Sequence, residues 1–281
     1  MYTIIEKKPL TEQVTLMKIL APFVAKHAKP GQFVMLRVHP DGERIPLTIA
    51  ESESKSGLIS IIYQVVGSTT RQLNHLKEGQ SLADFAGPMG QPTDLEGLKR
   101  VLVIGGGVGC AIAYPIVLAL SKRGCHVDTI IGFKQKEFVF LETEFRNASS
   151  TCTLLTDDGS YGTKGWVTDP LKDLLKEQSY DTIFAIGPLP MMKAVSEITR
   201  RYQIKTMVSM NPIMVDGTGM CGGCRVLYDG QIKFACVDGP DFDAHLVDFD
   251  DAMRRNRMYE TFESQKDAEL CRLTGEKRHD Q

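Results

Sequence analysis

The sequence has no excess of positive charge. It contains 33 Lys and Arg residues against 35 Asp and Glu residues, and its formal net charge is -2. Nucleic-acid binding needs a basic face, so we expect no nucleic-acid partner. No window approaches the roughly 18 uninterrupted apolar residues of a membrane-spanning helix, and the N-terminal segment has no apolar signal core. We therefore expect a cytoplasmic protein with no membrane partner.

Common hydrolytic motifs are missing as well. The sequence contains no G-x-S-x-G, H-E-x-x-H or Walker pattern, which removes the usual hydrolase and NTPase assignments. The histidines are scattered, and neither His75 nor His245 has a partner at a spacing typical of a metal site or a catalytic triad. We therefore expect no catalytic acid or base on this chain.

Glycine and cysteine are the residues that need an explanation. The chain has 281 residues, 25 of them glycine and 7 cysteine. At roughly 100–200 residues per domain, there is room for two domains and a small appendage. In a cytoplasmic protein, cysteines are more often free thiols, metal ligands or redox groups than disulfides.

Two patterns divide most of the chain. Residues 1–97 alternate short apolar runs with turn residues, as in Gln32–Val38 and Leu58–Val66, which predicts an antiparallel β-barrel. In residues 98–210, predicted strands alternate with helices, which is typical of a doubly wound α/β domain. The predicted elements of this domain are, in order, Val101–Ile104, Cys110–Lys122, Val127–Gly132, Phe138–Arg146, Cys152–Thr156, Thr168–Lys176, Thr182–Ile186, Met191–Tyr202 and Thr206–Met210.

The pattern changes again at Asn211, where glycines and cysteines crowd together. We expect residues 211–262 to form a small cysteine-rich unit with a charged helix near Asp251–Glu260, and residues 263–281 to form a polar tail. The expected fold class is therefore α+β and multidomain, with an N-terminal antiparallel β-barrel, a doubly wound α/β nucleotide domain and a small C-terminal unit.

A glycine run marks the first candidate nucleotide site. It follows a predicted buried strand and opens a helix, and it comprises Gly105, Gly106, Gly107, Val108 and Gly109. Glycine lets the backbone approach a phosphate, and a helix N-terminus presents free N–H groups to it. Cys110 breaks the G-x-G-x-x-G spacing, and Asp128 lies at the start of its strand rather than at the end. The alternative is a tight βα turn without a phosphate ligand.

A second glycine turn favours nucleotide binding. Gly187, Pro188 and Met191 lie where another predicted strand is followed by a helix. Ligands of such sheets bind beyond the carboxyl ends of the strands, and both turns belong to that edge. Asp157 and Asp158 lie at the same edge, where they could bond a ribose or cap a turn.

The densest cysteine pattern lies near the C-terminus. Cys221 and Cys224 form a C-x2-C pair among glycines, and a predicted hairpin turning at Asp229-Gly230 returns Cys236 beside them. Plant-type [2Fe–2S] loops have the spacing C-x4-C-x2-C and a later Cys. Here the x4 position is Asp216, so the candidate ligands are Asp216 and the three cysteines. A zinc site and a chance spacing are the alternatives.

The combination of a barrel, a glycine-turn domain and an iron–sulfur loop resembles the ferredoxin–NADP reductase superfamily. Within it, the chain is similar to the branch that contains the electron-transfer subunit of dihydroorotate dehydrogenase. The same branch contains the small subunit of NADH-dependent ferredoxin:NADP oxidoreductase, also known as a sulfide dehydrogenase subunit. The resemblance covers about residues 1–262. It implies FAD on the barrel, NAD(H) across the glycine turns and a [2Fe–2S] cluster at the C-terminal loop.

The resemblance also implies flavin-binding residues. The family's Arg-x-Tyr/Pro-Ser/Thr stretch corresponds to Arg44, Pro46, Leu47 and Thr48, with the Arg one place earlier than usual. The strand and turn that reach the ribityl chain and pyrophosphate correspond to Ile62, Tyr63, Gln64, Thr69 and Thr70. Without the resemblance, both segments would be assigned as plain strand and turn.

Asp216 distinguishes the two members of the branch. The dihydroorotate dehydrogenase subunit resembles this loop but has Cys there, whereas the transhydrogenase-type small subunit has Asp. We therefore expect the latter, which moves a hydride between NAD(H) and FAD and single electrons through the cluster to a larger flavin and iron–sulfur subunit. Ferredoxin is then an indirect partner, and the family's flavin can take part in electron bifurcation.

Two other functions stay open at this point. They are the dihydroorotate dehydrogenase subunit and a non-enzymatic nucleotide-sensing module with a structural zinc. The choice between NAD and NADP is open as well, since Lys134 and Lys136 follow a strand where a 2′-phosphate could bind but are equally consistent with solvated surface charges.

Overall fold

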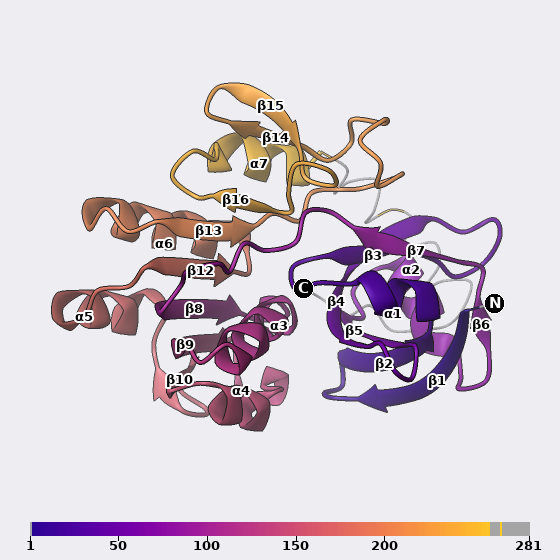
Figure 1. Ribbon diagram of the computed structural model, residues 1–281, viewed down its shortest axis with the longest axis horizontal. Coiled ribbons are helices and arrows are strands. Elements are labelled where there is room, and N and C mark those ends of the chain that lie inside the picture. Colours follow the sequence, from indigo (N-terminus) through magenta and orange to yellow (C-terminus); the bar gives the residue numbers. More distant parts are fainter. Residues whose placement is uncertain (1, 259–264, 266–281) are drawn as a thin grey trace.

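The computed structural model describes residues 2–258 and 265. Figure 1 shows an antiparallel barrel beside an α/β domain, with a hairpin unit at the edge of the α/β sheet. This architecture confirms the predicted fold class. Within the described residues, no helix is both long and apolar enough to cross a membrane.

The barrel is a nearly closed seven-stranded antiparallel sheet with the order β6-β1-β2-β5-β4-β3-β7. Met17, Ile19, Ile59 and Ile61 are fully buried in its interior, because alternate side chains of β2 and β5 point inward. Its elements are β1 (Tyr2–Pro9), β2 (Val14–Leu20), α1 (Pro22–His27), β3 (Phe33–Arg37), β4 (Arg44–Glu53), β5 (Leu58–Gln64), α2 (Ser68–His75), β6 (Ser81–Leu82) and β7 (Asp84–Met89).

The second sheet has the order β11-β10-β9-β8-β12-β13-β16, and all its pairs are parallel except that of β13 with the edge strand β16. Successive residues of β8 face opposite layers: Val101 packs with α3 and α4, and Leu102 packs with α5 and α6. The elements are β8 (Arg100–Gly106), α3 (Gly109–Lys122), β9 (His126–Phe133), η1 (Lys136–Phe138), α4 (Glu142–Ala148), β10 (Thr151–Thr156), β11 (Thr163–Lys164), α5 (Thr168–Glu177), β12 (Thr182–Ile186), α6 (Leu189–Arg201) and β13 (Thr206–Ser209).

One predicted helix starts in the wrong place. The sequence predicts a helix over Phe138–Arg146, but the structure has a short 3₁₀ turn before Val139, and α4 begins only at Glu142. Leu141 has a left-handed backbone with φ of 57°, so the chain changes direction there. Phe138, at the end of the 3₁₀ turn, and Phe140, in the connection to α4, therefore pack in the core without being part of an α-helix.

The C-terminal unit contains the hairpin β14 (Arg225–Tyr228) and β15 (Gln231–Phe234), strand β16 (Asp241–Asp243) and helix α7 (Phe249–Asn256). The hairpin turns at Asp229-Gly230 as predicted, and both residues have positive φ, as a type I′ turn requires. The predicted charged helix near Asp251–Glu260 corresponds to α7 as far as Asn256. Its predicted last residues beyond Met258 lie outside the described residues, as does the tail 263–281 apart from residue 265.

The segment after β7 attaches the barrel to this unit. The Gln91 N–H donates to Gly239 O at 2.6 Å, and the Thr93 hydroxyl donates to Asp241 Oδ2 at 2.5 Å. Burial raises the pKa of the Asp241 carboxyl to about 6. The barrel and the cysteine-rich unit are therefore joined directly by hydrogen bonds, although more than a hundred residues separate them in the sequence.

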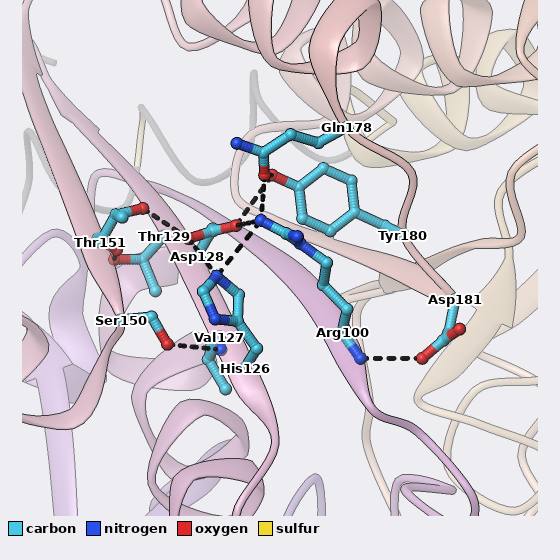
Figure 2. Close-up of polar contacts among 10 residues, drawn as sticks. All are labelled: Arg100, His126, Val127, Asp128, Thr129, Ser150, Thr151, Gln178, Tyr180 and Asp181. Carbon is cyan, nitrogen blue, oxygen red and sulfur yellow. Dashed lines mark hydrogen bonds and ion pairs between the residues drawn. The ribbon is translucent and has the colours of Figure 1, made fainter.

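A polar network occupies the amino edge of the parallel sheet (Figure 2). Asp128 is 1% exposed, and its carboxylate accepts hydrogen bonds from the hydroxyls of Thr151 at 2.6 Å and Tyr180 at 3.0 Å. His126 lies 3.1 Å and Arg100 3.5 Å from the same carboxylate. Burial alone would raise the pKa of Asp128, but these hydrogen bonds and positive charges together hold it below its usual value. Asp128 therefore stabilises the edge of the sheet opposite the glycine turns.

We expect Asp128→Asn to lower the free energy of unfolding at pH 7 by about 1–3 kcal/mol, because hydrogen bonds to a buried charge are lost. The lowered pKa means that Asp128 contributes stability near neutral pH and loses it as the pH falls through the folded-state pKa. The variant should therefore lose less stability than the wild type between pH 5 and pH 3 in urea unfolding. The control is Asp173→Asn, which breaks only an exposed ion pair with Lys176; an equal loss in both variants would contradict the prediction.

Candidate functional site

A cavity of about 1170 Å³ opens at the carboxyl ends of β8 and β12. All three parts of the fold contribute to its wall. The barrel supplies Gln64, Val65 and Val66, the α/β domain supplies both glycine turns, and the C-terminal unit supplies Cys221, Gly222 and Gly223. The volume is large enough for a dinucleotide-sized ligand.

The two glycine turns pack directly on each other. A Cβ atom on Gly109 would collide with Ile186 O and lie 2.7 Å from Gly187 Cα, and one on Gly106 would collide with Met191 Sδ. Gly107 has φ of 54° and open space where a side chain would point. Glycine is thus required at 109, where a side chain would meet backbone atoms, whereas at 106 the flexible Met191 side chain would have to move. Gly107 leaves room beside the N-terminus of α3.

The structure brings most predicted nucleotide residues to this cavity. Of the predicted set, its lining includes Gly106, Gly107, Val108, Gly109, Asp157, Gly187, Pro188 and Met191. Gly105 does not line it and lies in β8, facing Cys110. The carboxyl edge of the parallel sheet therefore collects predicted residues from three separate segments of the sequence.

Several lining residues were not singled out from the sequence as site residues. Trp166 is 68% exposed and lies on the cavity wall, as do Arg225 and Arg255. Lys134, which was considered from the sequence for a 2′-phosphate, lines the cavity as well. Trp166 could have been recognised from the sequence as a candidate site residue, because it is the one tryptophan of the chain and precedes a helix predicted at the carboxyl edge. Lys136 does not line the cavity, and its ammonium lies 5.7 Å from the centre of the Tyr161 ring.

The four candidate cluster ligands form two pairs. Cys224 Sγ lies 3.2 Å from Cys236 Sγ, and Cys221 Sγ lies 3.4 Å from Asp216 Oδ1. The Cys224–Cys236 pair is buried, whereas Asp216 and Cys221 are near the surface. Burial and the neighbouring Cys224 raise the pKa of the Cys236 thiol to about 12, so this thiol would lose its proton at neutral pH only to a metal.

The pairing fits a binuclear cluster better than a single metal ion. Each iron of a [2Fe–2S] cluster takes two protein ligands, whereas structural zinc takes four around one point. In the described part of the chain, no group of three or more His, Cys, Asp or Glu side chains converges closely enough to hold one metal ion. The donor set, three thiols and a carboxylate arranged as two pairs, therefore fits the predicted cluster.

The predicted flavin residues lie on the neighbouring strands β4 and β5 and in helix α2. Arg44 forms an ion pair with Asp84 at 3.0 Å, and Pro46, Leu47 and Thr48 pair with β3. Gln64 lines the cavity, whereas Ile62 and Tyr63 are buried and do not line it. Burial raises the pKa of Tyr63.

The turn before α2 offers space for a phosphate. A Cβ atom on Gly67, which caps the helix, would meet no atom within 4 Å. The Thr70 hydroxyl accepts from the N–H groups of Val66 and Gly67, and the Thr69 hydroxyl donates to Glu43 at 3.2 Å. Both hydroxyls thus hold the turn in shape, and the open helix start fits the pyrophosphate of FAD.

We expect Gly109→Ala to destabilise the α/β domain by about 2–3 kcal/mol, because a methyl group would force the start of α3 away from the end of β12. Thermal unfolding of Gly109→Ala and of a control variant measures this loss of stability. Gly67→Ala is the control, since its Cβ meets open space at an ordinary φ of -129°. A Gly109→Ala protein as stable as the control would show that the contact is not required.

Comparisons with known proteins agree with this geometry. Residues 211–248 match the family described as the iron–sulfur cluster binding domain of dihydroorotate dehydrogenase B. An uncharacterized protein encoded in an adh 3′ region of Clostridium beijerinckii is 47% identical, covering 96% of this chain and 94% of that protein. A homolog of the electron transfer subunit of dihydroorotate dehydrogenase B (NAD(+)) from Thermotoga maritima is 44% identical, and the match covers 97% of this chain and 96% of that protein.

A solved structure shows the same likeness in three dimensions. One chain of the NADH-dependent reduced ferredoxin-NADP oxidoreductase, from work on flavin-based electron bifurcation, superposes with a TM-score of 0.89. It is 43% identical, and the match covers 95% of this chain and 97% of that chain. The chain belongs to the family of dihydroorotate dehydrogenase B electron-transfer subunits and their homologues.

Proposed function

We propose that this protein is the flavin and iron–sulfur electron-transfer subunit of an NADH-dependent ferredoxin:NADP oxidoreductase. It binds FAD, NAD(H) and a [2Fe–2S] cluster, and a larger flavin and iron–sulfur subunit is its partner, with ferredoxin reached through that subunit. The observation that carries the proposal is the single cavity whose wall includes both nucleotide turns, the barrel residue Gln64 and the cluster ligand Cys221.

The cofactors supply the redox chemistry: bound FAD exchanges a hydride with nicotinamide and single electrons with the cluster. The chain positions these groups. Gly107 and the start of α3 receive the nucleotide pyrophosphate, and Asp157 accepts a hydrogen bond from the adenosine ribose. Gly165 N donates to Thr156 O, which brings Trp166 near Asp157 on the cavity wall, and there its ring stacks on the adenine. The hairpin β14–β15 holds Cys224 and Cys236 together.

The proposal keeps the divisions expected from the sequence. Residues 1–97 form the FAD-binding barrel, and residues 98–210 form the NAD(H)-binding domain. Residues 211–262 comprise the cluster unit with the C-terminal helix, and residues 263–281 are the tail. The cytoplasm is the proposed location, since the homologues are nucleotide-dependent enzyme subunits and cysteine ligands need a reducing compartment.

A second candidate is the electron-transfer subunit of dihydroorotate dehydrogenase itself. The match of residues 211–248 to that enzyme's cluster domain favours it, whereas Asp216 in place of a fourth cysteine favours the transhydrogenase-type subunit. Reconstitution with each type of partner subunit separates them. Turnover of dihydroorotate with its dehydrogenase partner would identify the dihydroorotate dehydrogenase subunit. NADH-dependent reduction of ferredoxin and NADP with the other partner would identify the transhydrogenase-type subunit.

We expect Asp216→Asn to lose the cluster while keeping FAD. Asp216 receives the Thr218 N–H on Oδ1 at 3.0 Å and the Cys221 N–H on Oδ2 at 3.1 Å. Asn has the same shape and keeps one of these two acceptors, but it lacks the anionic ligand. Visible absorption and iron and sulfide analysis of the purified protein measure the outcome. Asp216→Cys is the matched control and should keep a cluster. An unchanged cluster in Asp216→Asn would exclude Asp216 as a ligand, and a colourless wild type containing zinc would overturn the proposed function.

We expect NADH to quench the fluorescence of Trp166. The signal can be assigned without ambiguity, because the chain has one tryptophan.

Asp157→Asn should bind NADH several-fold more weakly and NADPH several-fold more tightly, because the carboxylate bonds a ribose hydroxyl and repels a 2′-phosphate. Titration of both nucleotides against the wild type and the variant measures the ratio.

The matched control is Asp158→Asn, since Asp158 does not line the cavity and its carboxylate accepts from Ser160 N at 2.9 Å. An NADPH preference that is the same in wild type, Asp157→Asn and Asp158→Asn would contradict the role of Asp157.

A further inference from the structure

Helix α7 lies between the nucleotide half of the cavity and the cluster loop. It packs on α6, which begins just after the Gly187 turn, and on β14, which begins just after Cys224. Its N-terminus is held by the Asp248 carboxylate, which accepts from Asp251 N at 2.9 Å, and Lys193 of α6 forms an ion pair with Asp250 at 2.7 Å. The helix is therefore fixed to both neighbours.

Arg255 extends from this helix to the cluster loop. Its Nη2 donates to Gly223 O at 3.3 Å, and the Gly223 N–H lies 3.4 Å from Cys221 Sγ. Gly223 stands between the two cysteines of the C-x2-C pair. By holding its carbonyl oxygen, Arg255 orients the loop whose N–H group points at a cluster ligand.

The same side chain lines the cavity that contains the nucleotide turns. Its neighbour Arg254 is exposed and forms an ion pair with Asp251, but Arg255 has no carboxylate partner among residues 2–258 and 265. A positive charge on the cavity wall stabilises an anion there. It also stabilises the reduced cluster, which carries one more negative charge than the oxidised form.

On the basis of the proposed function, we propose that Arg255 is a positioning residue shared by the nucleotide cavity and the cluster loop. Phosphates bound in the cavity neutralise its charge and thereby lower the reduction potential of the cluster. Because coupling between two sites is reciprocal, the reduced protein must bind the nucleotide more weakly than the oxidised protein. A tenfold difference in affinity corresponds to about 59 mV for a one-electron couple.

The test is an anaerobic redox titration of the full-length, FAD-loaded protein, with the cluster followed by electron paramagnetic resonance. ADP-ribose is the probe, because it keeps the pyrophosphate but has no nicotinamide to exchange electrons. We expect ADP-ribose to lower the cluster potential of the wild type. Arg255→Gln should have a lower potential without ADP-ribose and should lose most of the shift, while Arg254→Gln should behave like the wild type.

Arg255→Lys covers the possibility that the Gln variant does not retain its cluster. Lys keeps the charge but has no planar fork to serve both Gly223 O and a phosphate, so its unliganded potential should stay near that of the wild type and its ADP-ribose shift should shrink. An unchanged shift in every Arg255 variant, or an equal loss in Arg254→Gln, would overturn the inference. A wild type with a cluster but no shift overturns the inference alone, whereas a wild type without a cluster overturns the proposed function.

Discussion

The approach of α3 to the end of β12 is the contact on which the site depends. With a hydrogen in place of a side chain, Gly109 can lie against Ile186 O and Gly187 Cα. This packing brings the two glycine turns to a single point on the carboxyl edge, and Met191 lies over Gly106 for the same reason. The N-terminus of α3, the Gly187 turn and the start of α6 therefore open into one cavity rather than into two shallow ones.

The cysteine-rich unit reaches this cavity because it continues the same sheet. Strand β16 pairs antiparallel with β13, and Ala244 N donates to Thr206 O at 2.7 Å. The hairpin β14–β15 is thereby held beside the carboxyl edge, and Gln91 and Thr93 fasten the unit to the barrel. Since the unit contacts both larger parts of the fold, Cys221 can share a wall with residues of the barrel and of the nucleotide turns.

The sequence predicted the parts of the molecule whose signals are local. Buried strands such as Val101–Ile104, the glycine turns and the Asp229-Gly230 hairpin each depend on a few adjacent residues, and the structure has them. The predicted start of α4 was wrong, because the left-handed backbone of Leu141 cannot be recognised from the spacing of apolar residues. Arg255 and Trp166 were not identified as site residues, since only the folded sheet and helices bring them to the cavity. The pairing of the four candidate ligands likewise depends on how the hairpin closes, which spacing alone cannot give.

Net charge and local charge differ in this molecule. The chain carries a formal charge of -2, so it has no overall basic excess, but this sum says nothing about the charge of the cavity wall. Among the described residues, the charged side chains that line the cavity are Lys134, Asp157, Arg225 and Arg255. Three of these are cations, so the wall favours an anionic ligand although the whole chain is slightly acidic. The carboxylate of Asp157 lies on the wall with Lys134 and Trp166, and Arg225 and Arg255 lie by the cluster loop. Under the proposed function, a dinucleotide bound in this cavity would meet positive charge on the side of the cluster loop, where an electron would also be stabilised.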